Sequence, residues 1–122
     1  MLNKVSTYNF QINKGTDYYF SIRFQDCNGE EISLRGFQVT MHIRRNYLSN
    51  LIDELSIENK RIVSTSFEND GMMDTLEFSF PHEVTKKYPV GTLLYDLQIR
   101  STDAQISKIL EGHIQCQASI TQ

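Results

Sequence analysis

Hydrophobic and polar residues alternate along residues 92–100, and this is the clearest pattern in the chain. Side chains of a β-strand point to opposite faces with a period of two, so the stretch predicts a strand with one buried and one solvated face. Only Leu94 breaks the alternation. The apolar face carries Leu93, Tyr95, Leu97 and Ile99, and the polar face carries Thr92, Asp96, Gln98 and Arg100.

The same alternation recurs along the chain, with turn-forming residues between the segments. Short strands at a spacing of roughly ten residues are typical of an all-β sandwich. We therefore predict an antiparallel β-sandwich of about seven to nine strands, as a single domain over residues 1–122. The segments expected as strands are 8–12, 18–24, 32–34, 37–44, 61–65, 76–80, 92–100 and 110–120.

Residues 51–57 fit either a helix or a strand. We favour a strand that pairs with residues 61–65, because a lone short helix is only marginally stable. The helical spacing is carried by Leu48, Leu51, Ile52 and Leu55.

Residues 81–87 predict one helical turn. Pro81 suits the first helical position, Glu83 suits the positive end, and the pair Lys86–Lys87 suits the negative end. In the last strand, Gly112 falls among the inner positions and indicates a bulge. The other inner positions of that strand are Leu110, Ile114, Cys116, Ala118 and Ile120.

Composition and charge narrow the choice of partners. The chain has 122 residues and a formal net charge of −3. A phosphate-binding surface is usually basic, so we expect no nucleic-acid partner. The N-terminus lacks the apolar region of a signal peptide, and no run of about 18 apolar residues occurs. We therefore expect that the protein is made in a cytosol and has no membrane partner.

No pattern of residues points to catalysis, so we expect no enzyme activity, no catalytic residues and no cofactor. The histidines His42, His82 and His113 lack a second histidine or cysteine at ligand spacing, so no metal site is expected. No serine lies in a Gly-x-Ser-x-Gly turn. Asp96 is interpreted as a solubilising or hydrogen-bonding residue on a solvated strand face.

Two further groups of residues are interpreted as structural. Both cysteines are expected to be reduced, with Cys27 in a turn and Cys116 acting as a small hydrophobe in the last strand. The acidic residues of 26–31 do not follow the twelve-residue calcium loop. A hairpin turn around Asn28–Gly29 is therefore favoured there.

Several short runs occur in a fixed order after the turn Ser33–Gly36, namely Met41–Arg44, Leu55–Ser56, Glu58–Ile62, Pro89–Thr92, Tyr95–Leu97, Ile109–Gly112 and Ala118–Thr121. Taken together in this order, they resemble a widespread group of small structural proteins of tailed bacteriophages. The resemblance covers roughly residues 10–121, and the chain departs from it at Leu93–Leu94, where aromatic residues are common, and at the apolar pair Met72–Met73.

The resemblance implies an immunoglobulin-like sandwich that serves as a non-enzymatic virion component of the tail, neck, collar or baseplate. It implies location in the virion, after assembly in the host cytoplasm. The implied partners are copies of the chain itself, in a homo-oligomer, and other virion proteins. We hypothesise that the first or the last strand is the assembly edge, because an unpaired sheet edge can pair with a neighbour.

Two other functions remain open. The aromatic residues Tyr19, Tyr47 and Tyr88 are expected to point outward, where they could contact a sugar or a protein. That reading favours a carbohydrate- or receptor-binding module of a fibre or adhesin. The other alternative is a small regulatory or inhibitory protein of the host cytosol, which would be absent from purified particles.

Overall fold

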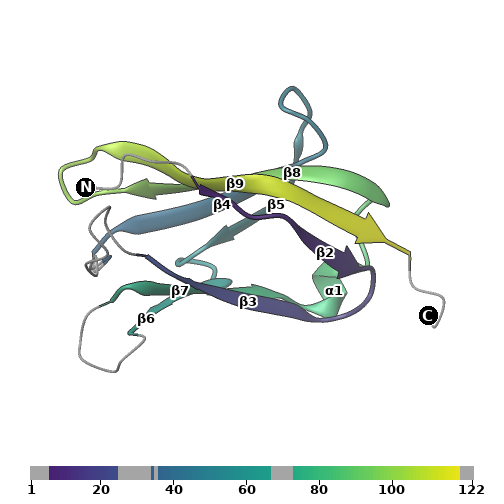
Figure 1. Cartoon of the computed structure of the whole chain (residues 1–122), viewed down its shortest axis with the longest axis horizontal. Coiled ribbons are helices and arrows are strands. Elements are labelled where there is room, and N and C mark those ends of the chain that lie inside the picture. The colour runs from purple at the N-terminus through teal and green to yellow at the C-terminus, as the bar shows by residue number, and fades with distance from the viewer. Residues whose placement is uncertain (1–5, 25–33, 35, 67–72, 119–122) are drawn as a thin grey trace.

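Two β-sheets pack face to face in the computed structural model, which describes residues 6–24, 34, 36–66 and 73–118 (Figure 1). We call the larger one sheet A and the smaller one sheet B. The spatial order of sheet A is β1 (Ser6–Thr7), β9 (Ile106–Gln117), β8 (Gly91–Arg100), β4 (Gln38–Arg44) and β5 (Leu51–Ser56), and β2 (Phe10–Asn13) also pairs with β9. The order of sheet B is β3 (Tyr18–Arg23), β7 (Thr75–Phe80) and β6 (Ile62–Thr65).

This strand order is that of an immunoglobulin-like sandwich. With β2 to β9 named A, B, C, C′, D, E, F and G, sheet B reads B-E-D and sheet A reads A-G-F-C-C′. Strand A lies beside G instead of beside B. The predicted all-β sandwich with about seven to nine strands is therefore confirmed, and its antiparallel pairing has one exception at the N-terminus.

The predicted helical turn is confirmed as α1 (His82–Thr85), which links β7 to β8. Pro81 precedes it as the N-cap residue. Thr85 is buried, and its hydroxyl accepts a hydrogen bond from the amide of Gly15 at 3.1 Å and donates one to the carbonyl of Thr16 at 2.8 Å. Helix α1 thereby fixes the turn between β2 and β3.

The core lies between the sheets and is built from the alternating apolar positions. In β8 the inner side chains are at most 4% exposed, so the predicted faces of residues 92–100 are confirmed. Aromatic rings fill the space between β2, β3, β7 and β8, with centroids 4.7–6.0 Å apart, in the range where ring pairs attract. The rings of this cluster are Tyr8, Phe10, Tyr18, Phe20, Phe78, Phe80 and Tyr95.

The N-terminal segment is the exception to antiparallel pairing, because β1 and β2 run parallel to β9. Between them, Asn9 Oδ1 accepts the amide of His113 at 2.9 Å, and the hydroxyl of Tyr95 donates to the carbonyl of Tyr8. A Cβ at Gly112 would lie 2.1 Å from that carbonyl oxygen. Gly112 is therefore needed for a close backbone approach, not for the predicted bulge.

The bulge of β9 falls at Ile109, the extra residue between Lys108 and Leu110 in the register with β8. Ile109 and Leu110 are both buried. The predicted inner face ends at Cys116, because Ala118 lies after β9 and is exposed.

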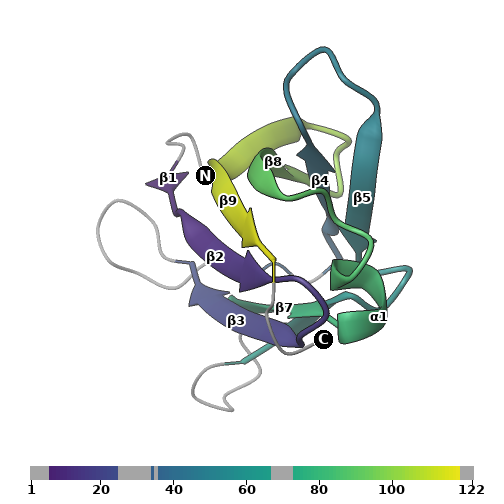
Figure 2. The same cartoon turned by 90° about the vertical axis from the view of Figure 1, so that its right-hand side faces the viewer.

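The last strand is not an edge of its sheet. β9 lies between β8 on one side and β1 and β2 on the other (Figure 2). The last strand, β9, therefore cannot be the assembly edge, and that part of the hypothesis is wrong. The N-terminal strands β1 and β2 do lie at the edge of sheet A.

The strand predicted at 51–57 is confirmed as β5, but its predicted partner is wrong. β5 pairs with β4 in sheet A, and the strand that follows it, β6, pairs with β7 in sheet B. The chain crosses between the sheets at this point. The expectations for residues 26–33, Met72 and Ile120 lie outside the described residues.

Candidate functional site

The solvent face of sheet A carries three carboxylates and one histidine, one from each of four adjacent strands, and we call them the charged row. Glu54, His42, Asp96 and Glu111 are in register across β5, β4, β8 and β9. His42 Nε2 lies 2.9 Å from Glu54 Oε1, and Lys108 Nζ lies 3.1 Å from Glu111 Oε1. Like charges on neighbouring strands repel, and the ammonium of Lys108 offsets the repulsion between the two carboxylates on β8 and β9.

Three adjoining hollows follow this face. The first, of about 180 Å³, lies over the charged row and is lined by Asp96, Glu111 and Tyr47 among others. A second, of about 350 Å³, shares His42 with it. A third, of about 130 Å³, shares Tyr47 and Glu111 and reaches His113. Carboxylates and a phenol ring on an open face can bind hydroxyl-rich or cationic groups.

The β4–β5 loop, residues 45–50, stands out from sheet A on the side away from sheet B (Figure 2). At its tip the side chain of Tyr47 is 77% exposed and that of Leu48 is 98% exposed. Leu51, which opens β5, is 41% exposed. We call this segment the Tyr47–Leu48 loop.

The Tyr47–Leu48 loop is held by its own polar side chains. Ser49 Oγ accepts the amides of Arg45 at 3.1 Å and Asn46 at 3.0 Å, and Asn46 Oδ1 accepts the amide of Leu48 at 2.9 Å. Arg44 Nη1 donates to the carbonyl of Ser49 at 2.9 Å. The loop therefore presents its two apolar side chains from an ordered backbone.

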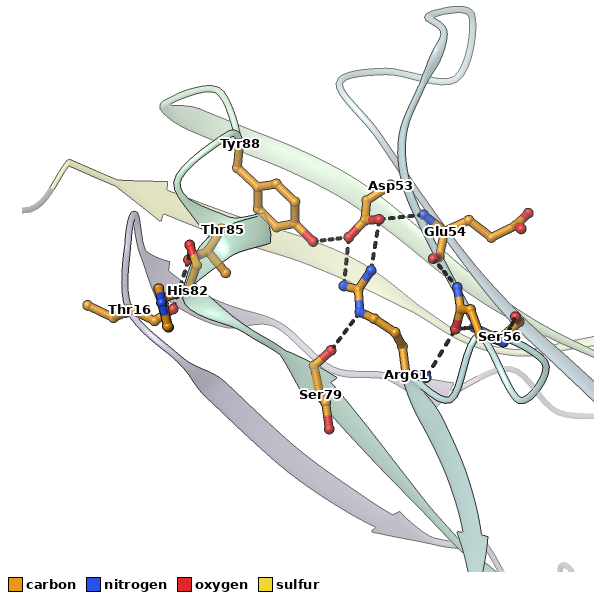
Figure 3. Close-up of polar contacts among 10 residues, drawn as sticks. Thr16, Asp53, Glu54, Ser56, Arg61, Ser79, His82, Thr85 and Tyr88 are labelled. Carbon is orange, nitrogen blue, oxygen red and sulfur yellow. Dashed lines mark hydrogen bonds and ion pairs between the residues drawn. The ribbon is translucent and has the colours of Figure 1, made fainter.

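Beneath the loop, three polar residues meet where the two sheets adjoin (Figure 3). Arg61 forms a bidentate ion pair with Asp53, with N–O distances of 3.0 and 2.7 Å, and Tyr88 donates its hydroxyl to the same carboxylate. Arg61 Nε also donates to the carbonyl of Ser79 at 3.1 Å. We call Asp53, Arg61 and Tyr88 the Asp53 junction. It joins β5 of sheet A to β6 and β7 of sheet B.

The free side of β5 is partly closed by nearby side chains. Asp53 Oδ1 accepts the amide of Glu54 at 2.8 Å, and Asn59 donates to the carbonyl of Glu54 and accepts the amide of Ser56, each at 2.9 Å. These backbone groups are therefore not offered to an added strand, which limits edge-to-edge pairing here.

The structure separates the three tyrosines that were predicted to point outward. Tyr19 on β3 is 58% exposed and Tyr47 is exposed as expected, but Tyr88 is only 1% exposed. The outward prediction for Tyr88 is wrong because Asp53 supplies a buried acceptor for its hydroxyl. Burial and the nearby carboxylate raise the pKa of Tyr88 above its ordinary value.

The other candidate residues lie apart from one another. His82 Nδ1 is 3.0 Å from Asp17, whose pKa is held below its usual range by the backbone amide and ring of His82. His113 is exposed on β9. Cys116 is a buried free thiol, and burial raises its pKa. Cys27 lies outside the described residues.

Within residues 6–24, 34, 36–66 and 73–118, no three His, Cys, Asp or Glu side chains are grouped so that they could hold a metal ion. In the same part of the chain, no helix has the length and apolar character needed to cross a bilayer. The residue that sequence reasoning missed is Leu48, which was grouped with the helical spacing of residues 51–57. The polar residues Asn46 and Ser49 on either side are turn formers and were the available signal.

No protein-family model matches the chain, and no curated protein matches it. Among solved structures, it is similar to CopC from Methylosinus trichosporium OB3b, with 12% identity, a TM-score of 0.42, and coverage of 95% of this chain and 88% of that one. It is also similar to extracellular domains 3–5 of Drosophila OTK, with 11% identity, a TM-score of 0.35, and coverage of 92% and 32%. At these values the similarity carries no argument about function. The strand order itself supports an immunoglobulin-like β-sandwich module.

Proposed function

We propose that this chain is a non-enzymatic structural module of a tailed-phage virion, in the tail, neck or baseplate. In this role it binds copies of itself and other virion proteins while the particle assembles in the host cytoplasm. The ordered motifs between residues 10 and 121 support the phage assignment by resemblance. The observation that carries the assembly role is the Tyr47–Leu48 loop, which exposes a tyrosine and a leucine instead of packing them in the core.

Such a loop is suited to protein contacts for a physical reason. Binding costs free energy when side chains and loops must be ordered, and this backbone is already held by Ser49 and Asn46. Aromatic side chains at the centre of an interface often carry most of its binding energy. Tyr47 and Leu48 therefore offer an anchor whose ordering cost is small.

Purified particles test the proposal directly. Mass spectrometry of density-purified virions, with host cytosolic proteins as the contamination control, should detect peptides of this chain in a constant ratio to the major tail protein. Gold-labelled antibodies in electron microscopy should then mark one position on the particle. A chain found only in the host cytosol would contradict the proposal and favour a regulatory protein.

A second candidate is a carbohydrate- or receptor-binding module, and the hollow over the charged row favours it. Tyr47 lines that hollow beside Asp96 and Arg44, so a sugar could stack on the ring, donate hydroxyl hydrogen bonds to Asp96 and accept them from Arg44. A glycan array compares the native chain with Asp96→Asn, which removes a charge without changing shape. Binding that is lost in Asp96→Asn, and retained in Tyr19→Phe on the other sheet, would support this candidate.

A further inference from the structure

The N-terminal segment forms one edge of sheet A. β1 and β2 follow β9 in a single register, which pairs Ser6 with Leu110 and Asn13 with Gln117 (Figure 2). Within the part of the chain that the structure describes, no strand of sheet A lies beyond them. We call residues 6–13 the N-terminal edge.

The even-numbered residues of the N-terminal edge direct their backbone groups toward β9. At one end, the amide of Tyr8 donates to the carbonyl of Glu111 at 3.0 Å. Just beyond the other end, the amide of Lys14 donates to the carbonyl of Gln117 at 2.8 Å. Backbone groups of successive residues in a strand point to opposite sides, and the register between these two bonds is constant. The odd-numbered residues therefore direct their backbone groups outward, away from β9.

Three residues offer both an N–H and a C=O on this outer side, namely Thr7, Asn9 and Gln11. No residue described by the structure forms a hydrogen bond with these backbone groups. All three residues are exposed. Their side chains are not placed to close the edge, because Asn9 Oδ1 accepts the amide of His113 and Gln11 Nε2 donates to Gln117, both on β9. An unpaired row of this kind is a template for an added strand.

The N-terminal edge also lacks the residues that commonly prevent strands from pairing at an edge. Charged side chains and prolines have this effect, and residues 6–13 contain neither. By contrast, β5 carries Asp53 and Glu54 and is partly closed by Asn59. β3 ends at Arg23, and β6 has only 4 residues. Of the outer strands that the structure describes, the N-terminal edge is therefore the best suited to accept another strand.

We propose that the N-terminal edge pairs with the same edge of a second copy of this chain, antiparallel about a two-fold axis. The two A sheets then become one continuous sheet. A two-fold axis brings the same surface of both copies together, so any charge near it meets its own kind and is repelled. The uncharged N-terminal edge avoids this repulsion. The inference rests on the proposed assembly function and names a partner for it.

The unpaired backbone groups select a register with Asn9 on the two-fold axis. Asn9 then faces Asn9 of the second copy, and Thr7 faces Gln11. Residues that face each other in this way exchange both N–H···O bonds, so the contact forms about six backbone hydrogen bonds. In the same register Tyr8 faces Phe10 of the second copy. The ring of Tyr8 is 38% exposed within one chain and gains an aromatic neighbour across the contact.

Substitutions at position 11 separate the backbone from the side chain. Gln11→Pro removes an outward N–H that no described residue uses, and its ring occupies the space of an incoming strand. Gln11→Ala is the matched control, because it loses the same side chain and keeps the N–H. Thr7→Pro repeats the test at a second outward position. Analytical ultracentrifugation of each full-length protein, up to about 100 μM, measures self-association, and circular dichroism shows whether each variant is folded.

We expect the native chain and Gln11→Ala to dimerise equally well, and each proline variant to dimerise about tenfold more weakly or less. Hydrogen exchange of the native chain, followed by NMR from dilute to concentrated solution, gives a second readout. Exchange at the amides of Thr7, Asn9 and Gln11 should slow as the concentration rises, because these amides become hydrogen-bonded in the dimer.

A native chain that stays monomeric, or folded proline variants that dimerise like it, would overturn the contact. A loss in Gln11→Ala as large as that in Gln11→Pro would also overturn it, because the side chain would then carry the association. Exchange rates that do not change with concentration would do the same, even if both proline variants fail to fold. Mass spectrometry of particles separates the two proposals. A monomeric chain that is present in virions overturns this contact alone, and a dimeric chain that is absent from virions overturns the proposed function alone.

Discussion

Two neighbouring regions of this protein reverse the usual distribution of polar and apolar residues, in opposite directions. The Asp53 junction buries a phenol and largely withdraws a carboxylate and a guanidinium from solvent, with side-chain exposures of 14% and 16%. The Tyr47–Leu48 loop, a few residues earlier in the chain, exposes a ring and a leucine to solvent. The polar groups of the junction are hydrogen-bonded to one another within the fold. The two side chains at the loop tip are instead largely surrounded by solvent.

This difference separates stability from function. Buried charges are tolerated only when they are paired and hydrogen-bonded, so the Asp53 junction belongs to the fold. An exposed apolar pair on an ordered loop adds little to the fold, so a reason for it must be sought outside the molecule. Substitutions in the two regions should therefore affect different measurements.

The largest effect is expected for Arg61→Ala. The substitution leaves the carboxylate of Asp53 inside the sandwich without its bidentate partner, and breaking such a pair costs about 3–5 kcal/mol of unfolding free energy. Urea denaturation followed by circular dichroism measures it. A loss near zero would mean that the junction does not hold the sheets together.

Alkaline pH should weaken the same interior. Burial raises the pKa of Tyr18, Tyr88 and Tyr95 above the ordinary 10.0. Below pH 10 these three tyrosines are neutral in the folded and unfolded chain, and their contribution to stability is complete. Above it the unfolded chain ionises first, so the unfolding free energy should fall by about 1.4 kcal/mol per pH unit for each tyrosine. Urea midpoints from about pH 8 to 11 measure this slope, which Tyr88→Phe should lower by about a third.

A smaller effect is expected for Tyr88→Phe at neutral pH. The ring still fills its place in the core, but one hydrogen bond to Asp53 is lost while the pair with Arg61 remains. The expected cost is about 1–2 kcal/mol of unfolding free energy. The same urea titration measures it, and a cost equal to that of Arg61→Ala would show that the hydroxyl is as important as the ion pair.

The smallest effect on stability is expected for Tyr47→Ala and Leu48→Asp. Both side chains are largely in solvent, so the unfolding free energy should change by less than about 0.5 kcal/mol. Thermal melts of both variants, beside Arg61→Ala, measure the contrast. A large loss at either position would remove the distinction between the two regions.

The sequence alone determined most of the strands and their faces. The alternation in β8 placed Tyr95 inside and Asp96 outside, because the two-residue period of a strand follows from local backbone geometry. The exposure of Tyr47 followed from the polar segment between two strands. These features depend on residues close together in the chain, so no knowledge of distant contacts was needed.

Only the tertiary structure decided which strands become neighbours and where a polar group finds a partner. β5 and β6 follow one another in sequence yet join different sheets, and the N-terminal segment runs parallel to β9. Tyr88 is buried because Asp53, distant in the chain, accepts its hydroxyl. The alignment of Asp96 with His42 and Glu111 likewise depends on register between strands. Pairing, register and burial are set by the free energy of contacts between distant residues, which the local pattern of a sequence does not contain.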